Sequence, residues 1–272
     1  MFVDADTELY GIFGNPIKHS LSPLLHNKMF EQYSINAVYT AFQVSDLENA
    51  VRGIKALGIK GINVTIPHKK DVIKFLDYID DDAKNLNAVN TIKNIDSKLY
   101  GYNTDYLGFM DTFKENIPDY FNKTITVLGA GGATRGVIYA LHKLGIEKIN
   151  IINRSVENAY NLKYDFKNMI DIDAFDIKSS KEILNKSEIV INCTSVGLND
   201  NESPVNVNHI DNAVVMDIIY KDTKFIELSK LKGLKTVNGM SMFINQAFYS
   251  FKIWKNIEFD KNLAFEILKE GQ

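Results

Sequence analysis

The stretch Ile125-Thr126-Val127-Leu128-Gly129-Ala130-Gly131-Gly132-Ala133 joins a short apolar run to a cluster of glycines. An apolar run of this length predicts a buried strand, and the residues after the glycines predict the start of a helix. Without side chains the backbone can approach a pyrophosphate, and the free N–H groups and dipole of a helix start favour its negative charge. The stretch therefore indicates a dinucleotide-binding turn, although Thr134 stands where the motif has its third glycine.

Strand-length apolar runs alternate with helix-length amphipathic stretches around this turn, which predicts an α/β fold with mostly parallel sheets. The segment 116–123 carries Pro118 and little apolar periodicity, so we expect a seam there. The strands expected after the seam, which suffice for a nucleotide-binding sheet, are 125–128, 148–153, 189–193, 214–218 and 236–237. The strands expected before it are 9–13, 37–42, 61–65 and 87–92, with helices from near Pro23, Asp46 and Lys70 and one or two more in 241–272.

Composition and charge exclude several classes of protein. The 272 residues, 45% of them hydrophobic, can fill one large core or two modest ones. A net charge of −3 with well-mixed signs shows no basic stripe for nucleic acid and no polybasic segment for a membrane, so we expect small molecules or copies of the chain as partners. Residues 1–6 lack the apolar core of a signal peptide, and no run approaches a membrane span. With one cysteine, Cys193, and no metal-ligand spacing, we expect a cytoplasmic protein without a disulfide or a metal.

The strand after the glycine turn ends in Asn153-Arg154-Ser155. At this offset an NAD enzyme carries a carboxylate for the ribose hydroxyls, whereas a neighbouring arginine accommodates a 2′-phosphate. The donors and positive charge of this segment favour NADP over NAD. The other interpretation is a solvated arginine at a strand end.

Two serines precede the first expected helix, in Ser20-Leu21-Ser22-Pro23. Pro23 suits the first position of a helix and Ser22 is a good N-cap, so capping accounts for Ser22. It leaves Ser20 unexplained, although in an extended approach Ser20 points to the same side as Ser22. Two hydroxyls beside the free N–H groups of a helix start would suit a carboxylate. The helix cap and the anion site both remain open.

A second polar group is spread over the first half of the chain. Thr65 lies on the polar side of its expected strand, and Lys69 follows beyond the strand end, where open α/β sheets place their ligands. Asn90 interrupts an apolar row, and burying an unpaired amide costs on the order of 1–3 kcal/mol, so Asn90 needs a partner or a cavity. Asp105 precedes an expected helix. Capping would account for it, whereas a carboxylate beside Lys69 would hold that amine in place for acid–base chemistry.

Taken in order, these motifs resemble the shikimate dehydrogenase family, whose members reduce 3-dehydroshikimate to shikimate with NADPH. The resemblance runs from about residue 10 to residue 254. The motifs that carry it are Gly14-Asn15-Pro16-Ile17-Lys18-His19-Ser20-Leu21-Ser22-Pro23 with His26-Asn27, Asn63-Val64-Thr65-Ile66-Pro67-His68-Lys69, Ala88-Val89-Asn90-Thr91, Asn103-Thr104-Asp105, Gly129-Ala130-Gly131-Gly132-Ala133, Asn153-Arg154-Ser155, Asn192-Cys193-Thr194-Ser195-Val196-Gly197, and Gly239 through Met242 to Gln246-Ala247.

The resemblance implies that Lys69 and Asp105 form the catalytic pair, with the lysine donating a proton to the ketone oxygen and Asp105 positioning it. At the substrate carboxylate it implies Ser20, Ser22 and Tyr220, and at the ring hydroxyls Thr65, Lys69, Asn90, Asp105 and Gln246. At NADP(H) it implies Gly129, Ala130, Gly131, Gly132, Ala133, Asn153, Arg154, Ser155, Thr194, Ile218, Gly239 and Met242.

The resemblance further implies two α/β domains with a cleft between them, the second of Rossmann type. Residues 1–104 plus 240–272 would bind substrate and carry catalysis, residues 105–239 would bind NADP, and the protein would be a monomer or a homodimer. The positions that depart from the family pattern are Asn158, where a second basic residue is frequent and Lys163 could substitute, Asp222 and Phe225, where Pro and Thr are common, and Ser241, where Gly is frequent.

Two other functions remain open from the sequence. A quinate/shikimate dehydrogenase that uses NAD or both cofactors would share the lysine–aspartate pair. A non-catalytic NADP-sensing protein would keep the fold and bind the cofactor without turnover.

Overall fold

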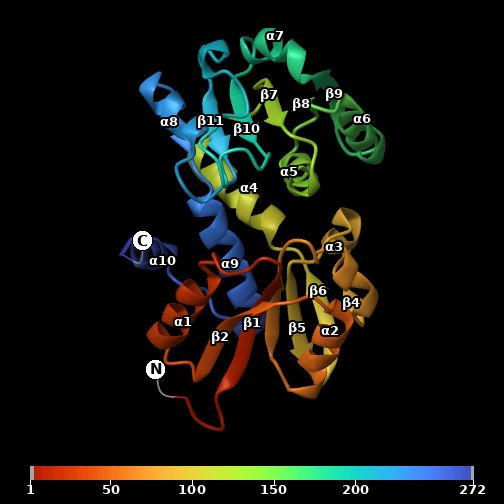
Figure 1. The fold of residues 1–272 in the computed structure, drawn as a ribbon, viewed down its shortest axis with the longest axis vertical. Coiled ribbons are helices and arrows are strands. Elements are labelled where there is room, and N and C mark those ends of the chain that lie inside the picture. The colour runs from red at the N-terminus through yellow and green to blue at the C-terminus, as the bar shows by residue number, and fades with distance from the viewer. Residues whose placement is uncertain (1–2, 271–272) are drawn as a thin grey trace. The chain divides into compact units, whose positions relative to one another are not determined.

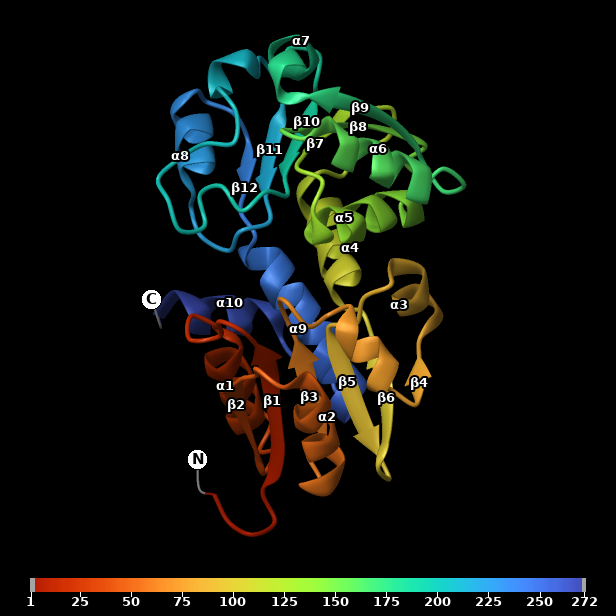
Figure 2. The same ribbon diagram turned by 45° about the vertical axis from the view of Figure 1, so that its right-hand side comes forward.

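The computed structural model describes residues 3–270, so the predicted domain limits at residues 1 and 272 lie outside the described residues. The chain divides into two compact units, Met1–Leu107 with Ile244–Gln272, and Gly108–Phe243. Each unit is an α/β fold built around its own sheet (Figures 1 and 2). The chain passes between the units inside two helices, α4 (Asp105–Asn116) and α9 (Met240–Lys255), and not in the expected seam at 116–123.

The first unit has a mixed six-stranded sheet in the order β2-β1-β3-β5-β6-β4. The prediction of a mostly parallel sheet is confirmed with one exception, because β5 is antiparallel to both neighbours while the other five strands run in the same direction. The cause is a hairpin whose two turn residues, Asp96 and Ser97, have φ of 49° and 61°, the positive values that a tight two-residue hairpin needs. The strands are β1 (Glu8–Gly14), β2 (Ala37–Gln43), β3 (Gly61–Val64), β4 (Tyr78–Ile79), β5 (Thr91–Ile95) and β6 (Lys98–Tyr102).

Helices cover both faces of this sheet. Ile54 packs with Ile62 and Ile92 in the core on one face. On the other face Trp254 donates to the Ile92 carbonyl at 2.9 Å and lies over Gly61, where a Cβ would come within 2.5 Å of the indole. The helices of the unit, besides the ends of α4 and α9, are α1 (Ser22–Gln32), α2 (Leu47–Ala56), α3 (Asp81–Leu86), α10 (Lys261–Glu270) and the 3-10 helix η1 (Asp71–Phe75).

Two expected elements of the first unit differ from the structure. The expected strand 87–92 begins only at Thr91, because Asn87 ends α3 in the left-handed conformation with φ 51°. The helix expected from Lys70 is the short 3-10 helix η1, which ends before the strand at Tyr78. The first of these differences leaves residues 88–90 as a loop between α3 and β5.

The second unit has a fully parallel sheet in the order β12-β11-β10-β7-β8-β9, the Rossmann strand order. All five expected strands are present. The sixth, β9, was missed because aspartates, which are poor strand formers, fill half of its sequence Asp-Ile-Asp-Ala-Phe-Asp. The strands are β7 (Ile125–Leu128), β8 (Lys148–Asn153), β9 (Asp171–Asp176), β10 (Ile189–Asn192), β11 (Val214–Asp217) and β12 (Thr236–Val237).

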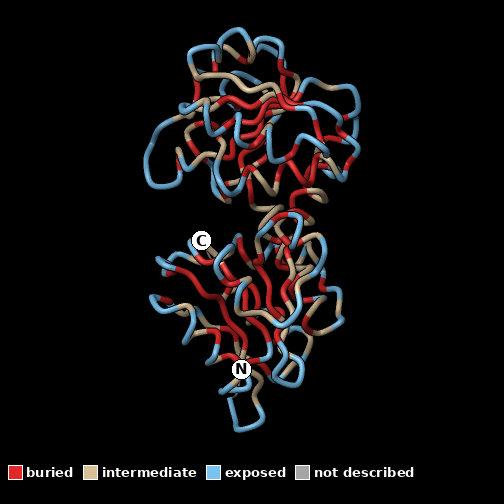
Figure 3. The backbone as a smooth tube through the Cα atoms, turned by 90° about the vertical axis from the view of Figure 1, so that its right-hand side faces the viewer, coloured by how far each residue is buried: buried red, intermediate tan, exposed pale blue. Residues whose placement is uncertain are grey.

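Helices shield this sheet so that its central strands are buried, as the buried stretches of backbone in Figure 3 show. Leu128, Val190 and Val215 pack against Phe225 and Ile226 in one core cluster. No helix within residues 3–270 is long and apolar enough to cross a membrane. The helices are α5 (Gly132–Lys143), α6 (Val156–Asp165), α7 (Ser180–Leu184), α8 (Lys224–Leu231) and the 3-10 helices η2 (Ile177–Ser179) and η3 (Val207–His209).

His26 of α1 is enclosed by aromatic side chains in the first unit. It has 0% of its surface exposed, stacks on Tyr39 at 4.5 Å between ring centroids and lies 5.3 Å from Trp254. Neither ring nitrogen has a hydrogen-bond partner among the described residues. Burial lowers the pKa of His26 to about 3. The imidazole is therefore neutral in the folded protein at neutral pH.

We predict that this histidine makes the fold sensitive to mild acid. The unfolded chain takes up a proton at its ordinary pKa near 6.5 and the folded chain does not, so stability is complete above that pH and falls as the pH drops toward 3. At pH 5 the loss from this group alone is about 2 kcal/mol relative to pH 8. Thermal melts of wild type and His26→Phe at pH 8 and pH 5 check this. The substituted protein should lose clearly less stability on acidification, and an equal loss in both proteins would contradict the prediction.

Candidate active site

Lys69 and Asp105 lie together in the first unit. The Lys69 Nζ donates to the Asp105 Oδ2 at 2.6 Å, and the two side chains are 32% and 24% exposed. Lys69 follows β3, and its backbone carbonyl accepts the Val89 N–H at 2.8 Å, while Asp105 opens α4. The expectation of a carboxylate beside this lysine is confirmed. A half-exposed ammonium held by a carboxylate is an arrangement that can transfer a proton to a bound ligand.

Asn90 holds the other oxygen of the same carboxylate. Its Nδ2 donates to Asp105 Oδ1 at 2.8 Å and to Thr104 Oγ1 at 2.9 Å, and its Oδ1 accepts the Thr104 N–H at 2.7 Å. Only 3% of the Asn90 surface is exposed. The expectation that this amide has partners is confirmed, because an unpaired one would be costly.

The structure corrects the interpretation of Asp105 as a helix cap. Asn103 Oδ1 accepts the N–H groups of Asp105 at 3.0 Å and Tyr106 at 3.4 Å, so Asn103 satisfies the start of α4. Its Nδ2 donates to the Ala88 carbonyl at 2.9 Å, which ties the helix start to the loop before β5. The carboxylate of Asp105 is left to Lys69 and Asn90, and it lies at a helix N-terminus, whose dipole favours a negative charge.

The structure also corrects the capping role of Ser22. α1 begins at Ser22, Leu21 holds the cap position, and no side chain caps the helix. Ser22 is 4% exposed and its side chain hydrogen-bonds the phenol of Tyr39, so it is turned away from the helix-start N–H groups. Ser20 Oγ instead accepts the Ser22 N–H at 3.3 Å. Binding of an anion at these serines stays a prediction.

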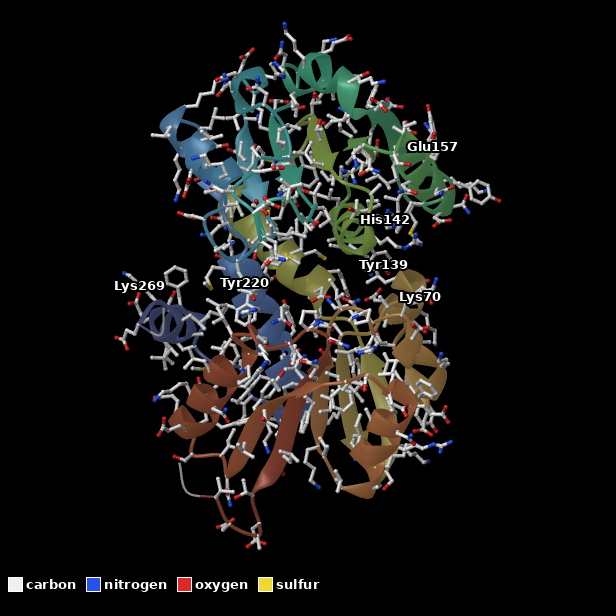
Figure 4. All side chains as sticks on the ribbon, viewed as in Figure 1. Lys70, Tyr139, His142, Glu157, Tyr220 and Lys269 are labelled. Atoms are coloured by element: carbon white, nitrogen blue, oxygen red, sulfur yellow. The ribbon has the colours of Figure 1, made fainter. Side chains whose placement is uncertain are left out.

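The remaining predicted substrate residues come from both units. Thr65 comes directly after β3, where its methyl group packs against Gly14, and Gln246 lies half-buried on α9. Both belong to the first unit, with Lys69 and the serines. Tyr220 belongs to the second unit, in the loop after β11, and its ring packs on Phe243 at 5.4 Å near the start of α9 (Figure 4).

The glycine turn of the second unit is open and well supported. Gly129 has φ +99°, and a Cβ there would lie 2.9 Å from the Thr194 methyl group, so only glycine fits. Gly131 and Gly132 are exposed, a Cβ on either would meet nothing within 4 Å, and no side chain caps α5. Thr134, which stands where the motif has glycine, donates to the Gly129 carbonyl at 3.0 Å and accepts the Gly131 N–H at 3.2 Å. A pyrophosphate fits such a turn, because the space at Gly131 and Gly132 lets it approach the backbone and the dipole at the start of α5 favours its charge.

The segment after β8 braces the same turn. Asn153 Oδ1 accepts the Ala130 N–H at 3.1 Å, and its Nδ2 donates to the Ser155 carbonyl at 2.8 Å. Arg154 is exposed beside them. The Ser155 hydroxyl donates to Glu157 at 2.8 Å, at the start of α6 (Figure 4).

Lys163 does not replace the missing basic residue at position 158. Its Nζ lies 3.9 Å from Asp171 and 3.7 Å from Asp173, on β9. Arg154 is therefore the basic residue that the segment 153–158 offers to a 2′-phosphate.

The end of β10 and the loop after β11 meet at Asp217, which sequence reasoning missed. Asp217 is fully buried and accepts hydrogen bonds from Asn192 Nδ2 at 3.0 Å, the Ile219 N–H at 3.0 Å and Thr223 Oγ1 at 2.7 Å. Burial raises the pKa of Asp217, while these hydrogen bonds lower it. In the sequence, its position directly after the apolar run Val214-Val215-Met216 could have indicated a buried carboxylate that needs hydrogen-bond partners.

The predicted cofactor residues in these loops are held closely. Thr194 donates through its N–H and its hydroxyl to Asn192 Oδ1 at 3.0 and 2.7 Å. The Gly239 N–H donates to the Ile219 carbonyl at 2.9 Å, and a Cβ on Gly239 would lie 2.2 Å from the Ile218 carbonyl oxygen. Met242 lies in the first turn of α9.

Asp222 stabilises the loop after Tyr220. Asp222, where the family commonly has proline, accepts from Asn238 Nδ2 at 2.9 Å and pairs with Lys230 at 2.5 Å.

Cys193 is buried, and burial raises the pKa of its thiol, so it is a packing residue and not a nucleophile.

Two family models and a curated relative match the chain. Residues 12–92 match the family model described as "Shikimate dehydrogenase substrate binding domain", and residues 111–218 match "Shikimate / quinate 5-dehydrogenase". The shikimate dehydrogenase (NADP(+)) of Aquifex aeolicus is 44% identical over 96% of both chains.

Two crystal structures have the same fold over nearly the whole chain. A shikimate dehydrogenase in complex with NADP+ is 36% identical over 99% of this chain and 97% of the other, with a TM-score of 0.92. The enzyme of Thermus thermophilus in complex with NADP(H) and shikimate is 28% identical over 98% of this chain and 100% of the other, with a TM-score of 0.88. Sequence, fold and the order of the motifs agree, and the chain belongs to the shikimate dehydrogenase family.

Proposed function

We propose that the protein interconverts 3-dehydroshikimate and shikimate with NADP(H), and that Lys69 and Asp105 are its acid–base pair. The observation that supports these roles is the ammonium of Lys69, 2.6 Å from a carboxylate whose second oxygen is held by the buried Asn90 amide. Membership of the family supports the reaction and the cofactor.

Lys69 supplies the proton in the reducing direction. NADPH, when bound, supplies the hydride to the carbonyl carbon. As that carbon accepts the hydride, the Lys69 Nζ donates a proton to the oxygen, so no alkoxide accumulates. Asp105 holds the amine in place and accepts a hydrogen bond from a substrate hydroxyl. In the oxidising direction the neutral amine of Lys69 takes the proton back.

Hydroxyl and amide groups orient the substrate in this proposal. Ser20 and Ser22 bind its carboxylate with Tyr220, and Thr65 and Gln246 bind ring hydroxyls. Asn90, whose amide hydrogens are taken by Thr104 and Asp105, contributes to the same site through Asp105. The turn at Ser20 supports this role because its hydroxyl already faces a helix-start N–H group.

The second unit binds NADP(H) in this proposal. The pyrophosphate lies on the turn formed by Gly129, Ala130, Gly131, Gly132 and Ala133, whose accessible backbone supports the assignment. Asn153, Arg154 and Ser155 would hold the 2′-phosphate, with Thr194 near the adenosine end of the cofactor. Gly239 would lie near the nicotinamide, and Ile218 and Met242 would complete the cofactor site. A cytoplasmic location and a monomer or homodimer complete the proposal.

Initial rates with shikimate and with quinate, each with NADP+ and with NAD+, test the function directly. We expect the fastest reduction of the nicotinamide with shikimate and NADP+. Faster turnover of quinate with NAD+ would favour the quinate/shikimate dehydrogenase, and NADP+ binding without turnover of either acid would favour a sensor.

We predict that Lys69→Met lowers kcat while NADPH binding stays unchanged. A positioned general acid contributes roughly 10²- to 10⁴-fold to a rate, so a loss within that range is expected. Steady-state rates and the fluorescence of bound NADPH measure the two effects. Lys70→Met is the matched control, since Lys70 is the adjacent, exposed lysine (Figure 4) and should keep near-native kcat. Near-native kcat in Lys69→Met would refute the acid–base role.

We predict different effects for the two serines. Ser20→Ala should raise KM for shikimate with little change in melting temperature, because its hydroxyl is only partly buried and makes one long hydrogen bond. Ser22→Ala should raise KM and also lower the melting temperature, because it removes a buried hydroxyl that bonds Tyr39. An unchanged KM for shikimate in both variants would show that the serines do not bind the substrate carboxylate.

We predict that Arg154→Ala weakens NADP+ selectively. Losing hydrogen bonds between a guanidinium and a phosphate raises KM for NADP+ roughly 10- to 100-fold. KM for NAD+ should change little, since NAD+ lacks the 2′-phosphate. Arg52→Ala, which removes an exposed arginine of α2, is the control. The assignment fails if KM for both cofactors changes by the same factor.

A further inference from the structure

Behind the site, the first unit contains a cluster of buried polar side chains that the proposed reaction does not use. Ser250, Thr91 and Thr104 are each 0% exposed, and Asn63 is 5% exposed. They come from α9, β5, the residue before α4, and β3, which lie far apart in the sequence. So many buried polar groups require mutual hydrogen bonds, because each one left unpaired costs free energy.

Ser250 connects the members of this cluster. Its Oγ lies 2.8 Å from Thr91 Oγ1 and 3.1 Å from Thr104 Oγ1, and it accepts from Asn63 Nδ2 at 3.0 Å. The Ser250 hydroxyl also donates to the carbonyl of Gln246 one turn earlier, at 3.1 Å. Since its one hydrogen serves that carbonyl and the Thr91 hydroxyl donates to Asn90 Oδ1, the Ser250 oxygen receives hydrogens from Asn63 and from the Thr104 hydroxyl.

The threonines of this cluster hold Asn90 in one orientation. Asn90 Oδ1 accepts the Thr104 N–H at 2.7 Å and the Thr91 hydroxyl at 3.0 Å. A flipped amide would point its NH2 group at the Thr104 N–H, so both groups would be donors. The NH2 group of Asn90 must therefore face Asp105, where it holds Oδ1 at 2.8 Å and leaves Oδ2 to Lys69.

A tyrosine and a second amide extend the cluster away from the catalytic pair. The Tyr39 hydroxyl donates to Asn63 Oδ1 at 2.7 Å, which fixes the Asn63 amide so that its NH2 group faces Ser250 and Thr91. Burial raises the pKa of Tyr39 far above its usual value, so the phenol stays a donor at all working pH values.

We infer that Ser250 is a positioning residue for the catalytic pair, acting through Thr91, Thr104 and Asn90 on the Asp105 carboxylate. This rests on the proposed acid–base roles of Lys69 and Asp105. Without the Ser250 hydroxyl, Asn63 and one threonine lose an acceptor, and the space left behind lets both threonines turn. Asn90 then loses its single orientation, and with it Asp105 loses the fixed contact that aligns Lys69.

Ser250→Ala tests the inference against a closely matched control. Ser229→Ala also removes a fully buried helical hydroxyl that donates to the carbonyl four residues earlier, at 2.7 Å, but in α8 of the other unit. We expect Ser250→Ala to lower kcat about tenfold or more, because small misplacements of catalytic groups are costly, with KM for NADP+ within about twofold. Ser229→Ala should keep kcat within about twofold of wild type.

The measurements are made well below the melting temperature of each variant. A Ser250→Ala protein that melts lower but keeps wild-type kcat would overturn the inference, because a purely structural hydroxyl behaves that way. If Ser250→Ala does not fold, Thr91→Val removes a neighbouring hydroxyl with little change of shape and is expected to lower kcat similarly. A wild type inactive with shikimate and NADP+ would instead refute the proposed function, so the two failures are distinct.

Discussion

A buried amide with no freedom to turn is the constraint on which the proposed catalytic pair, Lys69 and Asp105, depends. Asn90 has every polar atom committed, its oxygen to Thr104 and Thr91 and its NH2 group to Thr104 and Asp105. The low exposure of this side chain makes each bond costly to lose. Asn90 thereby holds the Oδ1 atom of Asp105, and the Lys69 ammonium bonds to Oδ2. Among the described residues, Lys69 is the only ammonium paired with this carboxylate. The geometry exists before any substrate binds, which is the condition for efficient proton transfer.

In the second unit, hydrogen bonds from side chains to the backbone fix the shape of the glycine turn and of the loops beyond the strands. Its glycine turn lacks the third glycine of the motif, and the Thr134 hydroxyl and the Asn153 amide support the backbone instead. Glycine is kept where contact demands it, at Gly129 against Thr194 and at Gly239 against the Ile218 carbonyl. A buried carboxylate, Asp217, connects the loops beyond β10 and β11. Side-chain hydrogen bonds to backbone groups thus shape the loops that family membership associates with the cofactor.

Local patterns predicted what depends on neighbours in the sequence. The apolar runs located all five expected strands of the parallel sheet, and the lone amide among apolar residues revealed that Asn90 needs partners. Predictions from local sequence patterns failed where a group far away in the sequence makes the contact that decides the local structure. Ser22 and Asp105 both fit the position of a helix cap, yet Tyr39 engages the first and Lys69 the second. β9 was missed because pairing with β8 outweighs its poor strand propensity.

The contacts that orient the site could not be read from the sequence. Ser250 lies 187 positions from Asn63 and 159 from Thr91, and no periodicity relates them. Which buried hydroxyl meets which amide is set by the packing of α9 on the sheet, where Trp254 covers Gly61. Asp217 is similar, since only the fold brings Thr223 and Asn192 to it.

A crystal structure of the protein with bound shikimate tests the central claim most directly. The account predicts the Lys69 Nζ about 3 Å from the hydroxyl oxygen that becomes the ketone, Asp105 still bonded to Asn90, and the carboxylate of the ligand at Ser20 and Ser22. A bound shikimate whose reactive hydroxyl lies beyond about 5 Å from Lys69, with its carboxylate away from the serines, would contradict it.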